Sequence, residues 1–81
     1  MDEKKYTISI NCEDEIKEEF NVEINQLDYK TLKEKLKAER NLILENYDIF
    51  DENGNNLNEN DFIKEKKDNI KLTIKIKQKI N

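Results

Sequence analysis

The stretch that decides the fold is Ile70-Lys71-Leu72-Thr73-Ile74-Lys75-Ile76-Lys77, near the end of the 81-residue chain. Apolar residues take every second position and polar residues the positions between, which is the period-two pattern of a strand with one buried face. We therefore expect two sets of side chains on opposite faces. The buried set is Ile70, Leu72, Ile74 and Ile76, and the outward set is Lys71, Thr73, Lys75 and Lys77.

Two earlier runs alternate in the same way, from Tyr6 to Cys12 and from Phe20 to Ile24, with the polar stretch 13–15 between them. We interpret these runs as an antiparallel hairpin, to which Ile16 has the right parity to belong. Short strands are also expected over 47–50 and at Leu57. The stretch 51–56 between them contains Asn-Gly, which suits turns that need a positive φ.

Between the hairpin and the later strands, the apolar period changes to that of a helix. Tyr29, Leu32 and Leu36 lie at i, i+3 and i+7, so they share one helical face and should join the core. Two starts are open: Asp28 as N-cap, or a capping box of Thr31 and Glu34. The candidate helix ends at 38–40, with Asn41 at the C-cap, after which Leu42, Ile43 and Leu44 return apolar groups to the core.

The expected order is two strands, one helix, two strands, a polar connection and a final strand. Phe62 and Ile63 should anchor the connection 58–67, which we expect to contain one turn of 3₁₀ helix. The fold class is therefore α+β: a mixed sheet of four to five strands packed on one helix. The length suits a single domain, residues 1–81, with its core at about 5–78.

This order and spacing resemble ubiquitin-like domains, which have the β-grasp fold. The residues that carry the resemblance are "YDIF" at 47–50, "DENGNNL" at 51–57, "DF" at 61–62 and "IKLTIKIK" at 70–77. The resemblance implies a central final strand parallel to the first. It also implies an open sheet face on which Lys71, Lys75 and Lys77 neighbour Lys5, Thr7, Ser9 and Asn11. The implied function is a protein-interaction or scaffold module, as a subunit or N-terminal domain of a larger assembly.

Two departures from ubiquitin shape the functional expectation. Ubiquitin-type modifiers end in Gly-Gly, whereas this sequence ends Gln78-Lys79-Ile80-Asn81, so we expect a module that is not conjugated. A modifier whose precursor tail lies outside this chain is an alternative. Ubiquitin also presents an apolar patch on its sheet, whereas the outward positions here are Lys and Thr. The expected protein-binding residues are Asp48, Phe50, Lys71, Thr73, Lys75 and Lys77, although the facing of Phe50 is open.

The stretch 47–57 followed by 61–62 also resembles the acidic turn of PB1 domains, which share the β-grasp fold and pair head to tail. This second alternative implies self-association by charge. The acidic side would be Asp51, Glu52, Glu59 and Asp61, and the basic side Lys4 or Lys5.

Missing residue types argue against catalysis and ligand chemistry. The chain has no His, the commonest general base, and no Gly-rich phosphate loop. Cys12 ends a strand on its inward parity and should be a buried apolar residue. The spacing of 51–62 does not fit an EF-hand loop, because Gly and Glu are not at the required positions. We expect no enzyme, no cofactor, no metal and no small-molecule substrate.

Charge and hydropathy limit the partners. The net charge of −4 argues against nucleic acid. No apolar run approaches the ~18 residues of a membrane span, and the start has no apolar signal region. A single cysteine fits a reducing compartment, so we expect a cytoplasmic protein. Its partner should be another protein with an acidic surface or a second copy of the chain.

Overall fold

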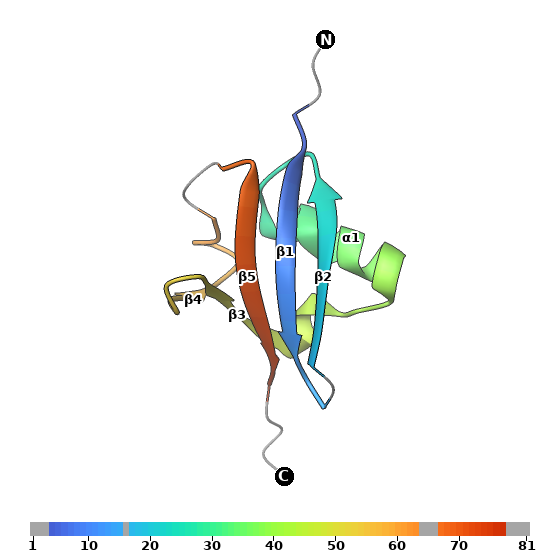
Figure 1. Ribbon diagram of the computed structural model, residues 1–81, viewed down its shortest axis with the longest axis vertical. Coiled ribbons are helices and arrows are strands. Elements are labelled where there is room, and N and C mark those ends of the chain that lie inside the picture. The colour runs from blue at the N-terminus through green and yellow to red at the C-terminus, as the bar shows by residue number, and fades with distance from the viewer. Residues whose placement is uncertain (1–3, 16, 64–66, 78–81) are drawn as a thin grey trace.

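A computed structural model describes residues 4–15, 17–63 and 67–77 of the chain. In this part, five strands form one mixed sheet, and α1 lies across one of its faces (Figure 1). The elements are β1 (Tyr6–Glu13), β2 (Lys17–Ile24), α1 (Tyr29–Arg40), the 3₁₀ turn η1 (Leu44–Asn46), β3 (Tyr47–Asp51), β4 (Asn56–Leu57) and β5 (Asn69–Ile76). The expected α+β class, with a five-stranded mixed sheet on one helix, is confirmed.

The final strand lies at the centre of the sheet, whose strand order is β2-β1-β5-β3-β4. It pairs parallel with β1, where Ile10 is opposite Leu72, and antiparallel with β3, where Ile49 is opposite Ile74. Both edges of β5 are therefore covered. This explains why its sequence shows the cleanest alternation in the chain, since both flanking strands restrict which way each side chain points.

The core is one layer of side chains between the sheet and α1. It takes the inward positions of the strands and one face of the helix. The described residues contain fourteen buried hydrophobic side chains: Ile8, Ile10, Cys12, Phe20, Val22, Ile24, Leu32, Leu36, Leu44, Ile49, Phe62, Ile70, Leu72 and Ile74. The same residues include no buried polar or charged side chain. The burial expected for Leu32, Leu36, Ile70, Leu72 and Ile74 is confirmed, and Tyr29 is half-buried.

Two residues expected in the core are not there. Ile76 is 42% exposed, because the pairing of β5 with β1 ends one residue earlier, at Lys75 opposite Glu13. Beyond that point only β3 flanks the strand, with Tyr47 opposite Ile76. Ile43 is 43% exposed, since it precedes η1 and only Leu44 of that turn is buried. The alternation of apolar and polar residues alone does not show where a neighbouring strand ends.

Local capping sets the ends of α1. The Asp28 carboxylate accepts a hydrogen bond from the Thr31 backbone N–H at 2.7 Å, so Asp28 rather than Thr31 is the N-cap. Asn41 closes the other end with a left-handed φ of 54°, and its N–H bonds to the carbonyls of Leu36 and Lys37. The helix also contacts the connection before β5, since the rings of Tyr29 and Phe62 meet edge to face at 5.9 Å.

The expected 3₁₀ turn is not found in the described part of the connection, residues 58–63 and 67. Residues 59–61 form a bend, whereas a 3₁₀ turn that was not expected occurs at Leu44–Asn46. The side chain of Asn58 accepts hydrogen bonds from the backbone N–H groups of Asn60 and Asp61. The Asp61 N–H also bonds to the Asn58 backbone carbonyl at 3.2 Å, so these bonds together form a single local turn at Asn58. Phe62 nevertheless anchors the connection as expected, being buried.

Three expectations fall on residues outside the described part. These are the place of Ile16 in the hairpin, residues 64–66 of the polar connection, and the chain end 78–81 without glycine. Among the described residues, no helix is long and apolar enough to cross a membrane.

Candidate interaction surface

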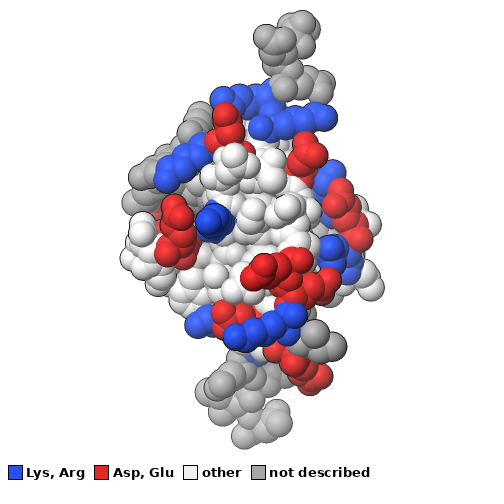
Figure 2. All heavy atoms as spheres, viewed as in Figure 1, with Lys and Arg blue, Asp and Glu red and all other residues white. Residues whose placement is uncertain are grey.

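The sheet face opposite α1, here called the open face, carries the outward side chains of all the long strands. At its centre Thr73 of β5 is flanked by Asn11 of β1 and Phe50 of β3. Ser9 and Asn21, opposite each other, continue this uncharged area. Figure 2 shows the face as a mostly uncharged centre bordered by lysines and acids. The open face is therefore broad, built of small polar groups, and rimmed by charge.

The structure brings together five of the six residues expected to bind a partner. These five lie on the open face: Asp48 is opposite Lys75, Phe50 is opposite Thr73, and Lys71 lies further along β5, opposite Ser9 of β1. Lys77 follows the end of β5, is exposed, and donates its backbone N–H to the Asn46 carbonyl.

The facing of Phe50, open from the sequence, follows from its neighbours. Ile49 is buried toward α1, so Phe50 points to the open face, opposite Thr73. The Lys75 ammonium lies 5.2 Å from the centre of its ring, within cation–π range. The half-buried ring is thus partly covered by a flexible charged side chain rather than fully presented to solvent.

The lysines of β5 do not form a purely basic stripe. Lys75 has Glu13 opposite it on β1 and Asp48 opposite it on β3. Lys71 has the uncharged Ser9 opposite it on β1. The polar stretch 13–15 predicts a turn that begins at Glu13, but β1 extends to Glu13, which pairs with Lys17 at the start of β2. The parity of Glu13 with Ser9 and Asn11 was the available signal.

The acidic turn is organised by its own first residue. The Asp51 carboxylate accepts hydrogen bonds from the backbone N–H groups of Asn53 and Asn55, each at 2.9 Å, and from the Asn55 side chain. These hydrogen bonds hold the pKa of Asp51 below its usual range, and the bond from the Asn55 backbone N–H has the largest effect. Gly54 supplies the expected positive φ, at 85°. The Asp51 charge thus stabilises the hairpin.

The other three acidic residues of this candidate surface, Glu52, Glu59 and Asp61, do not share a common partner in the contacts described below. Glu52 pairs with Lys67 at 3.6 Å, and the Asp61 backbone is held by Asn58. Glu59 is exposed. On the candidate basic side, Lys4 pairs with Asp68 at 3.3 Å.

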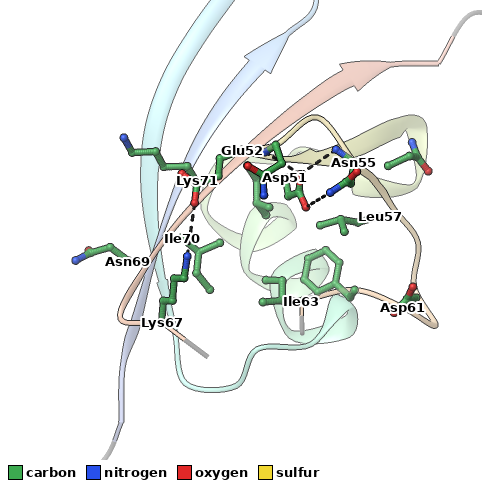
Figure 3. A pocket seen from close by; sticks show the side chains of 14 residues that line it. Asp51, Glu52, Asn55, Leu57, Asp61, Ile63, Lys67, Asn69, Ile70 and Lys71 are labelled. Atoms are coloured by element: carbon green, nitrogen blue, oxygen red, sulfur yellow. Dashed lines mark hydrogen bonds and ion pairs between the residues drawn. The ribbon is translucent and has the colours of Figure 1, made fainter. Parts of the chain in front are cut away.

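A hollow of about 420 Å³ lies beside the acidic turn, between the β3–β4 hairpin, the connection and the start of β5 (Figure 3). Leu57, Phe62, Ile63 and Ile70 line its apolar part, and Asp51, Asn55, Lys67 and Lys71 are among its polar residues. Among the described residues, no three His, Cys, Asp or Glu side chains gather closely enough to hold a metal ion. The hollow adjoins the open face at Lys71.

Cys12 lies inward on β1 with 5% of its surface exposed, so the expected buried cysteine is confirmed. Burial raises the pKa of its thiol, which opposes formation of the reactive thiolate. Nearby, the Tyr47 hydroxyl donates to Asp14 at 2.9 Å, and burial raises the pKa of Tyr47 as well. The hydrogen bond from Tyr47 to Asp14 joins β3 to the β1–β2 turn, and the Cys12 thiol and the Tyr47 hydroxyl keep their protons at neutral pH.

Comparison with protein-family models, with curated proteins and with solved structures finds no match to this chain.

Proposed function

We propose that this chain is a ubiquitin-like β-grasp domain that acts as a protein-interaction or scaffold module, and that it binds through the open face. The observation that carries the proposal is that one face of the sheet is packed against α1 while the other has no covering element in the described part of the chain. The strand order, with a central β5 parallel to β1, supports the β-grasp assignment.

The chemistry of the open face favours a protein as the ligand. Its centre at Asn11, Thr73 and Phe50 offers hydrogen-bonding groups and one aromatic ring across several strands. The strands β1, β2 and β5 each have four outward positions and β3 has two. At a strand spacing of about 4.8 Å, these positions give a footprint of roughly 450 Å² on each partner. About 900 Å² over both partners is the size of a weak or transient protein interface.

The mixed charges of the rim change the kind of partner that fits. A uniformly acidic partner would meet Glu13 and Asp48 on either side of Lys75. A partner with both charge signs is the better match, because complementary pairs at a rim steer association and reject wrong registers.

The acidic turn is the second candidate surface, and the contacts of Asp51 weigh against it. A carboxylate that already accepts three hydrogen bonds from its own loop has fewer lone pairs left for a partner's lysine. In a head-to-tail pairing like that of PB1 domains, Asp51 would therefore contribute little to binding the basic side of a second copy.

The test is capture of partner proteins by the tagged chain and by two arginine variants. Thr73→Arg puts a long cation at the centre of the open face. Ala38→Arg adds the same side chain and charge to the exposed side of α1 and is the matched control. We expect Thr73→Arg to weaken binding at least about tenfold, since it obstructs the middle of the interface, and Ala38→Arg to bind like the parent chain. Equal capture by both variants would exclude the open face, provided that both melt like the parent.

A further inference from the structure

One row of outward residues on the open face alternates in charge from strand to strand. The register places Lys17 of β2 opposite Glu13 of β1, Glu13 opposite Lys75 of β5, and Lys75 opposite Asp48 of β3. Read across the sheet, the signs are plus, minus, plus, minus. When this row is laid against a copy of itself in reversed order, every charge lies opposite a charge of the other sign.

The neighbouring rows contain few charges. The next row reads Glu19, Asn11, Thr73 and Phe50 from β2 to β3, and the row after it reads Asn21, Ser9 and Lys71. A second sheet laid on this face would meet small polar side chains in its middle and the alternating charges at one end.

From this pattern we infer that the open face binds a second copy of this chain as a symmetric, face-to-face dimer. This inference deepens the proposed function and rests on it, since it names an occupant of the same face. The two-fold axis runs parallel to the strands, between β1 and β5. It places Lys17 against the second copy's Asp48 and Glu13 against the second copy's Lys75. In the next row it places Asn11 against Thr73, and the methylene groups of Glu19 against Phe50.

The charges favour this axis, which forms four pairs of opposite charge, over three other axes. An axis moved onto β1 would place Lys17 against Lys75 of the second copy. An axis moved onto β5 would place Glu13 against Asp48. An axis across the strands, through the row of Asn11 and Thr73, would place Lys71 against Lys75. Each of these brings like charges together, whereas the axis between β1 and β5 does so at none of the paired outward positions of β1, β2, β3 and β5.

The geometry of stacked sheets is compatible with these pairs. Packed sheets lie about 10 Å apart and cross at about 30°. With the crossing point at Asn11 and Thr73, the charged row is one outward position away, about 7 Å along the strands. The crossing then displaces it sideways by about 3–4 Å, which is less than the strand spacing and within reach of lysine side chains. Lys17, Asp48 and Lys75 are exposed and Glu13 is half-buried.

The dimer should be weak and dependent on salt. Its footprint is that of a weak or transient interface, and each copy carries a net charge of −4 that opposes association. Salt screens both the attractive pairs and the repulsion between the two net charges, because the Debye length falls from about 14 Å at about 0.05 M salt to about 4 Å at about 0.5 M. The attractive pairs are in close contact, so we expect them to outweigh the net repulsion at low salt. We expect the dimer dissociation constant to rise on the order of tenfold between these conditions.

Charge exchange between two variants tests the inference. Glu13→Lys and Lys75→Glu are prepared separately, combined as a double variant, and also mixed as two single variants. Sedimentation velocity of the 81-residue chain, up to about 0.5 mM and at about 0.05 M salt, measures the dimer fraction. We expect the parent and the double variant to dimerise and each single variant to be monomeric. The equimolar mixture should form a heterodimer, because one chain then carries lysine at both positions and the other glutamate.

The mixture separates the interface from effects within one chain. Glu13 and Lys75 are also neighbours in the same sheet, so each single variant loses stability by itself. Mixing cannot repair a contact within a chain, but it does restore a contact between chains. If a single variant does not fold, Glu13→Gln and Lys75→Gln replace it, and each should weaken dimerisation about threefold or more.

Two results would overturn the dimer. One is a parent chain that stays monomeric over the whole concentration range at low salt. The other is a mixture of folded single variants that stays monomeric. Neither result would affect binding of another protein to the open face, which the Thr73→Arg capture experiment tests separately.

Discussion

Ile74→Ala tests the central position of β5 most directly. Ile74 is fully buried, between Cys12 of β1 and Ile49 of β3. The substitution removes three carbon atoms, which at about 0.8 kcal/mol for each buried carbon costs about 2.4 kcal/mol before any cavity forms. The cavity cost adds to this, so we expect a loss of about 3–4 kcal/mol in the free energy of unfolding.

Urea unfolding followed by circular dichroism measures this loss, and Ile76→Ala is the control. Ile76 lies two positions further along the same strand and is 42% exposed, so the same substitution there should cost under about 1 kcal/mol. A domain of this length has a total stability of about 4–12 kcal/mol, so a loss of 3–4 should also lower the melting temperature by more than about 10 °C. Equal losses for the two variants, or a loss below about 1 kcal/mol for Ile74→Ala, would contradict the placement of β5 between β1 and β3.

The two ends of α1 give further predictions. Asp28→Ala should lower the free energy of unfolding by about 1 kcal/mol at pH 7, measured by urea unfolding. The hydrogen bonds from Thr31 lower the pKa of Asp28, so its contribution is present above the unfolded value of about 3.9 and is lost as pH falls through the lower folded value. The difference between parent and variant should therefore shrink below about pH 4, whereas Asp28→Asn should retain a cap without titrating; a constant difference would argue against the cap. At the other end, Asn41→Ala should cost about 1 kcal/mol, because alanine disfavours a φ of 54°. Asn41→Gly should be within about 0.5 kcal/mol of the parent, and equal losses for both variants would argue against the left-handed cap.

Much of the fold could be predicted because the sequence carries two separate periodicities. The alternation in 70–77 specifies a strand and its buried face, and the spacing of Leu32 and Leu36 specifies the helix face. What the alternation lacks is information about neighbours. The exposure of Ile76 depends on where β1 ends, and the 3₁₀ turn at 44–46 depends on how the chain leaves α1. Both are decided by residues distant in sequence, which a local pattern does not contain.

The candidate surface could be predicted only in part, for a similar reason. Parity gave the outward positions of β5, but the character of the surface depends on strand register. Lys75 belongs to a basic stripe when β5 is considered alone and to an alternating row once Glu13 and Asp48 are beside it. The role of Asp51 was also hidden, since its charge suggested a binding residue while its contacts are with its own turn.

The two proposals for the open face are linked, because one face holds one occupant at a time. A second copy that covers Asn11, Thr73 and Phe50 excludes another protein from the same residues. Dimerisation then reduces the free face as the concentration of the chain rises, and binding of a partner draws chains out of the dimer by mass action. A weak, salt-dependent dimer suits this arrangement, since a partner with mixed charges then has to displace only a weakly bound second copy. The same alternating row would then serve both occupants: it fixes the register of the second copy and selects a partner whose charges follow the same order.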